Sequence, residues 1–439
     1  MVPSGRYALI RKSCRSIPGA SYIRFVRSAT TLYFEWTDRF TGDRVDDTEV
    51  IDEVKKLKIE TPSWGYGDSG TRFKTFSWHG AARNIWEKID DAALVNELTG
   101  AAPRVALHIP WDIVDDFAEL RGYAEERGLK IGAINPNLFQ DEEYRLGSAC
   151  NPDPAIRRRA IDHMLLCAGI CGETGADILS LWFADGSNYF GQDDIIRRKH
   201  HLMESLEEVY AALPSGVRML IEYKFYEPSF YHTDIPDWGT SHLLTQKLGS
   251  RAQVLIDTGH HPLATNVEQI VANLVDEGIL GGFHFNSRNY GDDDLVVGAS
   301  DPFQLFKIFH EIVSAERSSE EVRSSCARNI AYMVDQSHAI EGKIEPMILS
   351  IINCQVARAK ALLVNADELR ELQLAGDVLG AHELVQDAFQ TDVTPLLSKM
   401  REDQGIPVDP IRAFREGGYA EKMARERKGG ESSGSGYPT

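Results

Sequence analysis

Short apolar or β-branched segments alternate with longer amphipathic segments between residues 58 and 337, and this alternation restricts the fold more than any other feature. Strands that alternate with helices require a parallel sheet, and eight repeats favour closure into a (β/α)8 barrel, or TIM barrel, over an open doubly wound sheet. No GxGxxG or Walker pattern follows a predicted strand, which disfavours a nucleotide-binding sheet. The predicted strands are 59–64, 105–110, 129–135, 178–183, 218–223, 254–257, 282–285 and 332–335.

Helical patterns fill most gaps between these strands, and after residue 337 the pattern becomes wholly helical. A C-terminal all-helical extension cannot line the mouth of a barrel, because strand ends and their loops form that surface. Such an extension usually covers another surface, often a neighbouring subunit, so we expect an oligomer. The predicted barrel helices include 84–98, 154–173, 194–213 and 266–277, and the extension is predicted to hold helices 344–364, 366–374, 379–390 and 392–401.

The two ends of the chain differ in composition from the barrel and its extension. No acidic residue precedes Glu35, whereas arginine, lysine and serine are frequent there, as in an organelle transit peptide. A mis-assigned start site would produce a similar segment, and the composition does not separate these two explanations. The last residues are polar and rich in Gly and Ser, which predicts a disordered tail. The predicted parts are a basic, poorly ordered segment (1–44), a catalytic barrel (45–340), a helical extension (341–424) and a tail (425–439).

The charge and cysteine content of the 439-residue chain restrict its partners and its compartment. The formal net charge is −19, and an acidic surface repels phosphate backbones and anionic lipid headgroups. We therefore expect no nucleic-acid or membrane partner, while neutral substrates and divalent cations remain compatible. The 6 cysteines form no CxxC pair, and no apolar run approaches the roughly 20 residues that span a bilayer. Together these features indicate a reduced, cytoplasmic protein.

Polar side chains at the ends of the predicted strands carry most of the chemical information, because active sites of such barrels lie at the carboxyl ends of the strands. Glu222, Asp257, His284 and Asp335 come from four successive predicted strands and are expected to converge on one point. Unpaired carboxylates at that density would repel one another and raise their own pKa values, and a divalent cation removes this conflict. Carboxylates with one imidazole suit Mn²⁺, Co²⁺ or Mg²⁺.

A second group of possible ligands lies nearby in the sequence. His260 follows Asp257 by three residues, and the loop after the seventh predicted strand contains Asp292 and Asp294, whose alternation lets both point at one target. With Asp257 shared as a bridge, they could hold a second cation, and two neighbouring cations can polarise both oxygens of an acceptor. Taken singly, Asp257 could be a helix cap, the DDD run a solvated loop and His284 a core histidine. Joint placement at the ends of successive strands favours the functional interpretation.

Long, ordered motifs along residues 61–415 make the chain resemble a known family. The motifs are PSWGYGDSGTRF (62–73), LHIPWD (107–112), WFADGSNYFGQ (182–192), IEYKFYEPSFY (221–231), DWGTS (237–241), DTGHH (257–261), GGFHFN and YGDDDL (within 281–295) and MVDQSH (333–338). On these motifs the chain is similar to the L-rhamnose isomerases of the broad-specificity bacterial type. The segment upstream of Val45 departs from the family and carries nothing of its N-terminal helices.

The resemblance implies a site with two divalent cations per subunit, Mn²⁺ before Co²⁺ or Mg²⁺. It implies that Glu222, Asp257, His284 and Asp335 hold a structural cation, and that Asp257, His260, Asp292 and Asp294 hold a catalytic one. It also implies a homotetramer in which loop 65–73 of a neighbouring subunit closes the site, with Phe73 as the intruding aromatic side chain. The expected catalytic residues are Asp335, Lys224 and His108, and the expected substrate-binding residues are Trp64, Trp182, His261 and Phe73.

The implied reaction converts L-rhamnose to L-rhamnulose, a step of rhamnose catabolism, by moving a hydrogen between C1 and C2 of the open-chain sugar. The hydrogen can move as a hydride, or as a proton through an enediol. The hydroxyl proton is expected to pass through a metal-bound water or hydroxide positioned by Asp335. A hydrophobic pocket discriminates a methyl group by only about 1–3 kcal/mol, so L-lyxose, L-mannose, D-allose and D-psicose are further expected substrates.

Three other functions were weighed against the isomerase. A ketose 3-epimerase on a similar barrel would need two glutamates as acid and base, and only Glu222 is evident at a strand end. A metal-dependent abasic-site endonuclease would need a basic groove, which the acidity of the chain disfavours. A non-catalytic sugar- or metal-binding barrel should have lost some ligands, whereas all the expected ones are present. The isomerase is therefore the preferred interpretation.

Overall fold

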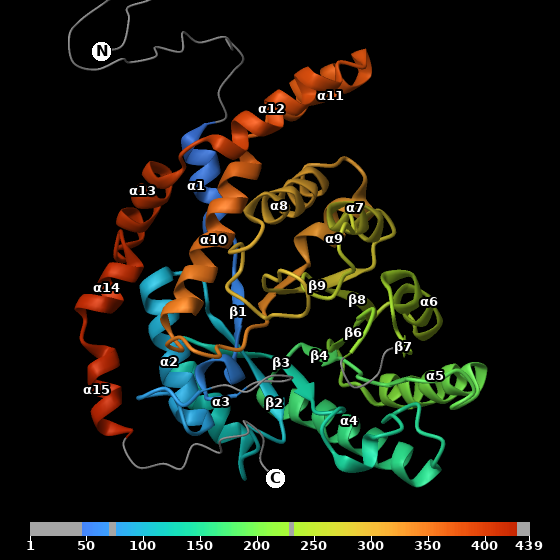
Figure 1. Cartoon of the computed structure of the whole chain (residues 1–439). Helices are drawn as coiled ribbons and strands as arrows, with labels where there is room; N and C mark the ends of the chain where they lie inside the picture. The colour runs from blue at the N-terminus through green and yellow to red at the C-terminus, as the bar shows by residue number, and fades with distance from the viewer. Residues whose placement is uncertain (1–45, 70–75, 228–231, 428–439) are drawn as a thin grey trace, which may run out of the picture. The chain divides into compact units, whose positions relative to one another are not determined.

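The computed structural model describes residues 46–69, 76–227 and 232–427, and its centre is a closed barrel of parallel strands (Figure 1). Successive barrel strands are neighbours in the sheet, and the first pairs with the last to close the ring. All eight predicted strands are present, which confirms the predicted (β/α)8 barrel. The barrel strands are β1 (Ile59–Pro62), β2 (Arg104–Ile109), β3 (Lys130–Pro136), β4 (Ile178–Leu181), β6 (Arg218–Glu222), β8 (Ala252–Asp257), β9 (Leu280–Phe285) and β10 (Ala331–Val334).

Helices cover the outside of the barrel, and short polar residues define where several of them begin. The side chains of Asp194, Asp237 and Asn266 accept hydrogen bonds from backbone N–H groups in the first turn of α5, α6 and α7. Each such cap stabilises a helix by about 1 kcal/mol. The helices up to β10 are α1 (Asp47–Lys55), α2 (Ile85–Thr99), α3 (Phe117–Glu126), α4 (Pro154–Thr174), α5 (Ile195–Ala212), α6 (Trp238–Leu248), α7 (Val267–Asp276), α8 (Pro302–Glu316) and α9 (Glu321–Arg328), with 3-10 turns η1 (Ser63–Tyr66) and η2 (Glu142–Tyr144).

The inside of the barrel is filled by a small apolar cluster to which most barrel strands contribute. Side chains alternate between the two faces of a strand, so the residue two positions after an inward one also faces inward. Leu220 and Leu255 belong to the cluster, and Glu222 and Asp257 therefore face the interior at the carboxyl ends of β6 and β8. The other members of the cluster are Trp64, Ala106, Ala133, Ile178 and Met333.

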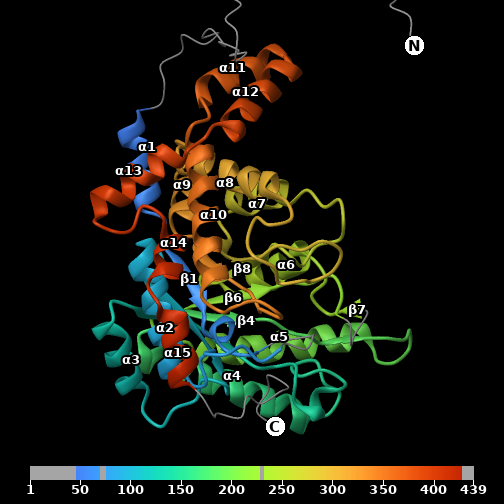
Figure 2. The ribbon, with the colours of Figure 1, turned by 60° about the vertical axis from the view of Figure 1, so that its left-hand side comes forward.

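The chain after the barrel is helical, as predicted, and lies along one side of it (Figures 1 and 2). Helix α10 packs against α8, α13 contacts α1, and α14 contacts α2. Among the described residues no single helix is long and apolar enough to cross a membrane, and α10 with α11 passes that test of length and composition only as a pair bent by 61°. The helices are α10 (Glu345–Leu362), α11 (Ala366–Ala375), α12 (Val378–Gln390), α13 (Thr394–Gln404), α14 (Pro410–Glu416) and α15 (Tyr419–Glu426).

The structure describes the chain up to Arg427, which includes the first three residues of the predicted tail. Helix α15 continues to Glu426, and the buried side chain of Arg427 donates hydrogen bonds of 2.8 and 2.9 Å to the carboxylate of Asp91. The hydroxyl of Tyr419 donates to the same carboxylate at 2.7 Å. A buried carboxylate on α2 therefore holds residues whose own composition is typical of disorder. Residues 1–45 and 428–439, including the predicted basic segment, lie outside the described residues.

Candidate metal centre

Four side chains from four successive barrel strands meet at the carboxyl end of the barrel. Glu222, Asp257, His284 and Asp335 each offer one ligand atom, and these atoms all lie within 4.8 Å of one another. The Nδ1 atom of His284 is 3.1 Å from Glu222 Oε2 and 3.6 Å from Asp335 Oδ2. The structure thus brings together the residues that the sequence placed in the first group.

A second group shares Asp257 with the first. Asp257, His260 and Asp292 also offer ligand atoms within 4.8 Å of one another. The Nε2 atom of His260 is 3.3 Å from Asp292 Oδ2, and Nδ1 is 3.0 Å from Glu222 Oε1. Asp294 is not a member of this group among the described residues, but it is buried, and its charge raises the pKa of Asp257 and Asp335. Asp294 therefore lies beside the two groups.

A helix cap does not explain Asp257, and a solvated loop does not explain Asp292 and Asp294. Helix α7, which follows Asp257, is capped by Asn266, so Asp257 is not its cap. Within the DDD run, Asp293 accepts hydrogen bonds from the backbone N–H groups of Asn289 and Tyr290 and so organises the loop. Its neighbours Asp292 and Asp294 instead turn toward the barrel, where the acidic groups lie.

Burial dominates the electrostatics of this site. Burial raises the pKa of Asp257 well above its ordinary value, and the charges of Glu222 and Asp335 add to this. Burial also raises the pKa of Asp335, to about 6. For Glu222 burial acts in the same direction, but His284 and His260 outweigh it and lower the pKa. Burial lowers the pKa of His284, and Glu222 and Asp335 outweigh it and raise the value to about 10. Positive charge is therefore favourable at this place.

The donor atoms fit divalent cations. The two groups combine carboxylate oxygens with one imidazole each, and such mixed oxygen and nitrogen sets suit Mn²⁺, Co²⁺ or Mg²⁺. Burying several carboxylates together without a cation costs free energy, and His260, His284 and Lys224 offset part of that cost. The predicted ligand set is thus chemically reasonable, with Asp257 common to both groups.

Several predicted pocket residues line a narrow cavity of about 40 Å³ above the first group. Trp64 donates its Nε1–H to Asp335 Oδ1 at 2.9 Å. The ring of His108 stacks on Trp111 at 3.8 Å, and burial lowers its pKa well below 6.5, so the imidazole is neutral near neutral pH. The lining residues are Trp64, His108, Trp111, Asn135, Pro136, Phe139, Ser180, Trp182, Glu222, His260, His284 and Asp335.

Of the predicted substrate-binding residues that the structure describes, His261 does not line this cavity. His261 is buried, but its Nε2 lies 2.7 Å from the hydroxyl of Tyr223, and His261 is not among the residues lining the cavity. Phe73 lies outside the described residues. By contrast, Lys224 is buried beside the second group, where its Nζ donates to Asp292 Oδ2 at 2.8 Å. The hydrogen bond to Asp292 thus holds the ammonium group of Lys224, which is predicted to contact the substrate, in a defined position.

Residues 97–337 match the family model described as xylose isomerase-like TIM barrel. This stretch is more than half of the chain and contains both acidic groups. The chain belongs to the xylose isomerase-like TIM barrel family. A probable sugar isomerase of Rhizobium meliloti is 40% identical over 93% of this chain and 96% of its own length. Another, of Mesorhizobium japonicum, is 41% identical over 88% of this chain and 91% of its own length.

Other relatives of this xylose isomerase-like barrel are more distant. The L-rhamnose isomerase of Rhodopirellula baltica is 24% identical over 78% of this chain and 84% of its own length. Among solved structures, an L-ribulose 3-epimerase superposes with a TM-score of 0.50 at 15% identity, covering 71% of this chain and 98% of the epimerase. The last similarity is one of fold. The chain is therefore a sugar isomerase-like barrel, and its relation to L-rhamnose isomerases is remote.

Sequence reasoning missed several contributors to the site of this xylose isomerase-like barrel, among them Glu227, Trp111 and Phe139. Glu227 is buried, and its Oε2 accepts a hydrogen bond of 2.5 Å from Lys224 Nζ. Trp111 and Phe139 line the cavity together with Trp182. A signal was available for Glu227, which follows Lys224 by three residues in the EYKFYEP stretch. No local pattern marks Phe139, which lies on the loop after β3.

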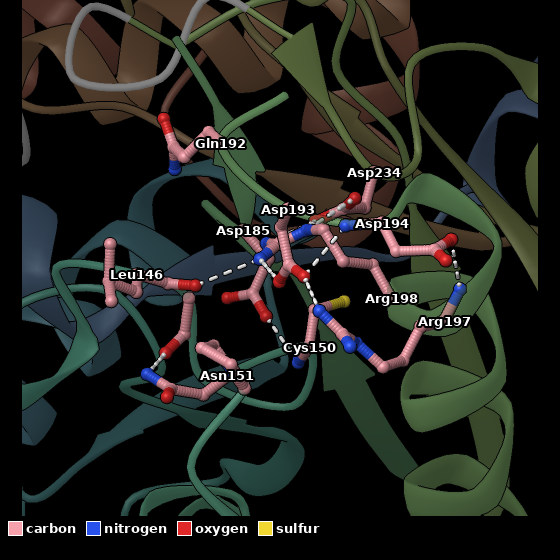
Figure 3. Close-up of polar contacts among 12 residues, drawn as sticks. Leu146, Cys150, Asn151, Asp185, Gln192, Asp193, Asp194, Arg197, Arg198 and Asp234 are labelled. Carbon is pink, nitrogen blue, oxygen red and sulfur yellow. Dashed lines mark hydrogen bonds and ion pairs between the residues drawn. The ribbon is translucent and has the colours of Figure 1, made fainter. Parts of the chain in front are cut away.

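A separate charge network holds the loops of this xylose isomerase-like barrel around the cavity (Figure 3). The buried guanidinium of Arg198 donates to Asp234 at 2.7 Å and to the carbonyl of Leu146 at 3.0 Å, and its Nη1 lies 3.3 Å from Asp193 Oδ2. These three partners lie on the loops after β6, β3 and β4, respectively. Arg198, on α5, therefore ties three loops together.

The neighbour of this network, Asp185, joins the same loops through the backbone. Its carboxylate accepts hydrogen bonds from the N–H groups of Ser148 and Cys150 at 2.7 and 2.8 Å, and its carbonyl accepts from Asp234 N–H at 2.9 Å. Beside it the two-stranded sheet of β5 (Gly186–Ser187) and β7 (His232–Thr233) pairs the loops after β4 and β6. Gly147 has φ +104°, and a Cβ there would lie 2.9 Å from Arg198 Nη2. Only glycine lets the backbone approach the guanidinium so closely.

We expect Arg198→Met to lower the free energy of unfolding by about 3–5 kcal/mol, because the substitution leaves buried carboxylates without their counter-charge. Urea unfolding followed by circular dichroism measures this change. Arg197→Met is the matched control, since Arg197 is an exposed neighbour on α5 whose solvent-screened ion pair with Asp193 should contribute little to stability. Equal effects of the two substitutions would contradict the assignment.

The raised pKa of Asp335 predicts a pH-dependent stability of chelator-treated protein. In the folded chain Asp335 keeps its proton up to pH about 6, whereas its ordinary value is 3.8. Wild-type protein should therefore lose stability relative to Asp335→Asn as the pH rises between these values, because the unfolded chain releases its proton in this range while the folded chain keeps it. Thermal unfolding should show equal midpoints for the two proteins near pH 3.8. Above pH about 6 the midpoint of Asp335→Asn should be higher than that of the wild type. A difference that shrinks with rising pH would contradict this prediction.

Proposed function

We propose that this xylose isomerase-like barrel is a divalent-cation-dependent aldose–ketose isomerase that converts L-rhamnose to L-rhamnulose and acts on related sugars. The observation that carries the proposal is the pair of buried carboxylate–histidine groups that share Asp257 below a cavity lined by aromatic side chains. The names of the two relatives at 40% and 41% identity, both probable sugar isomerases, support the reaction class. The name of the relative from Rhodopirellula baltica supports L-rhamnose as the substrate.

The chain's own residues supply binding and proton transfer. The residues of the first and second groups would hold two cations. These cations would polarise neighbouring oxygens of the open-chain sugar. Lys224 Nζ is fixed between Asp292 and Glu227 and offers a positive donor for a sugar oxygen. Trp64 N–H holds Oδ1 of Asp335, so the other carboxylate oxygen can accept a hydroxyl proton of the substrate.

The remaining cavity residues orient the sugar and exclude water. His108 is neutral, and its buried Nδ1 has no hydrogen-bond partner among the described residues, so it can bind a sugar hydroxyl without adding charge. Phe139 and Trp182 lie with ring centroids 4.6 Å apart and offer apolar faces to the C–H groups of the sugar. The predicted homotetramer, the closing loop with Phe73 and the cytoplasmic location stay predictions.

The first test is ketose formation from L-rhamnose after removal and return of the cation. We expect activity to vanish after treatment with chelator and to return with Mn²⁺, because the acidic groups hold the cations that polarise the substrate. The same assay with L-lyxose, L-mannose and D-allose ranks the substrates. Absence of activity on every aldose tried, with Mn²⁺ bound, would overturn the isomerase proposal.

A ketose 3-epimerase is the second candidate, because the buried Glu227 provides the second glutamate that the sequence did not reveal. In an epimerase Glu227 would be an acid or base, and Glu227→Gln would lower kcat by about 10²–10⁴-fold. In the isomerase Glu227 only supports Lys224, and we expect a loss of about tenfold or less in aldose–ketose conversion. Chromatography of the products from L-rhamnose and from D-psicose separates the two reactions. C3 epimerisation by the wild-type protein that is lost in Glu227→Gln, without aldose–ketose conversion by either protein, would favour the epimerase.

A further inference from the structure

We propose that Asn286 belongs to the second cation site, where its amide N–H groups orient Asp257 and its amide oxygen faces the cation. The proposal concerns the ligand environment of the isomerase site proposed above and rests on that function. Asn286 directly follows β9 and is buried, with 5% of its surface exposed. It comes two residues after His284, so alternation places its side chain on the same inner side of the barrel.

The amide nitrogen of Asn286 faces both oxygens of Asp257. Nδ2 lies 3.0 Å from Oδ1 and 3.0 Å from Oδ2 of that carboxylate. When Asp257 is ionised, as it would be as a ligand of a cation, the opposite orientation of the amide would place an oxygen against the carboxylate, so the donor points this way. Because Asp257 is the residue common to both acidic groups, a hydrogen bond that fixes its orientation affects both of them.

The backbone of Asn286 is held as firmly as its side chain. Its N–H donates to Thr258 Oγ1 at 3.0 Å, and its carbonyl accepts from the same hydroxyl at 2.9 Å. Thr258 N–H in turn donates to the carbonyl of His284 at 3.0 Å. The loop after β8, which carries His260, is thereby joined to the end of β9. Asn286 is therefore positioned before any ligand arrives.

The amide oxygen of Asn286 is the second observation that points to a ligand. Although buried, Oδ1 accepts no hydrogen bond from the described residues. A Cβ atom on Gly259 would lie 2.6 Å from this oxygen, 3.0 Å from Asp292 Oδ1 and 3.2 Å from Asp257 Oδ1. Three oxygens from three segments thus converge beside a residue that has no side chain. A hard divalent cation is the ligand class that such a cluster of oxygens accepts.

A neutral amide suits this position better than another carboxylate. Asp257 already lies close to Glu222, Asp292 and Asp335, and a further negative charge would add to their repulsion. An amide contributes an oxygen toward the cation and two N–H donors without adding charge. The role of Asn286 is therefore that of a positioning residue for Asp257, with an oxygen donor turned toward the second group.

The test is the affinity of the full-length protein for Mn²⁺, measured by the electron paramagnetic resonance signal of free Mn²⁺ during titration. We expect Asn286→Ala and the similarly shaped Asn286→Leu to weaken binding by about 10–100-fold. Asn353→Ala is the matched control, because it removes another partly buried amide that donates to a backbone carbonyl. The control should bind Mn²⁺ as wild type does, and thermal unfolding in chelator reports the metal-free stability of each protein.

Each outcome of these measurements bears on a stated claim. A lowered Mn²⁺ affinity of both variants, with metal-free unfolding midpoints near that of the control, supports the proposal, because a purely structural role would change the midpoints and not the affinity. Unchanged affinity overturns it. Two variants that unfold even with Mn²⁺ also overturn it, since Asn286 would then serve the fold. A wild-type protein that binds no Mn²⁺ would overturn the proposed function as well, whereas absent sugar isomerisation with intact Mn²⁺ binding affects only that function.

Discussion

Repulsion between buried carboxylates at the carboxyl end of the barrel is the constraint on which the rest of the site depends. Asp257, Glu222 and Asp335 are held on neighbouring strands whose backbone hydrogen bonds keep the strands at a set spacing. The carboxylates cannot move apart without breaking the ring of strands. Compensation must therefore come from positive charge, and His284 already binds a proton more tightly than an ordinary histidine. The divalent cations proposed here would compensate the negative charge of the carboxylates more effectively than a protonated histidine.

A separate group of Cys150, Asp185 and Asp234 shows another way to compensate buried negative charge. Cys150, Asp185 and Asp234 also place ligand atoms within 4.8 Å of one another, so geometry alone does not distinguish them from the metal centre. There, however, the guanidinium of Arg198 donates to Asp234 and satisfies the charge from within the chain (Figure 3). Where the protein supplies its own large cation the result is a structural support. Where imidazoles and one lysine lie beside the carboxylates, the result is a candidate site for metal.

The placement of carboxylates at the strand ends could be predicted from sequence, because side chains alternate between the two faces of each strand. In β6 the alternation that buries Leu220 also turns Glu222 inward, and β8 does the same for Leu255 and Asp257. The direction of a side chain at a strand end follows from the pattern within that strand. His261 shows the limit of this reasoning, because it lies on the loop after β8, where no alternation applies, and it pairs with the hydroxyl of Tyr223.

The sequence by itself therefore determined the barrel, the strand ends at which carboxylates and histidines gather, and the helical nature of the extension, because each follows from a local periodicity. Only the tertiary structure decided which loop residues complete the site. Lys224 reaches Asp292, Asn286 reaches Asp257, and Arg427 reaches Asp91 across separate segments of the chain. Pairings between distant segments depend on how the barrel closes and how its loops fold back, and no local pattern contains that information.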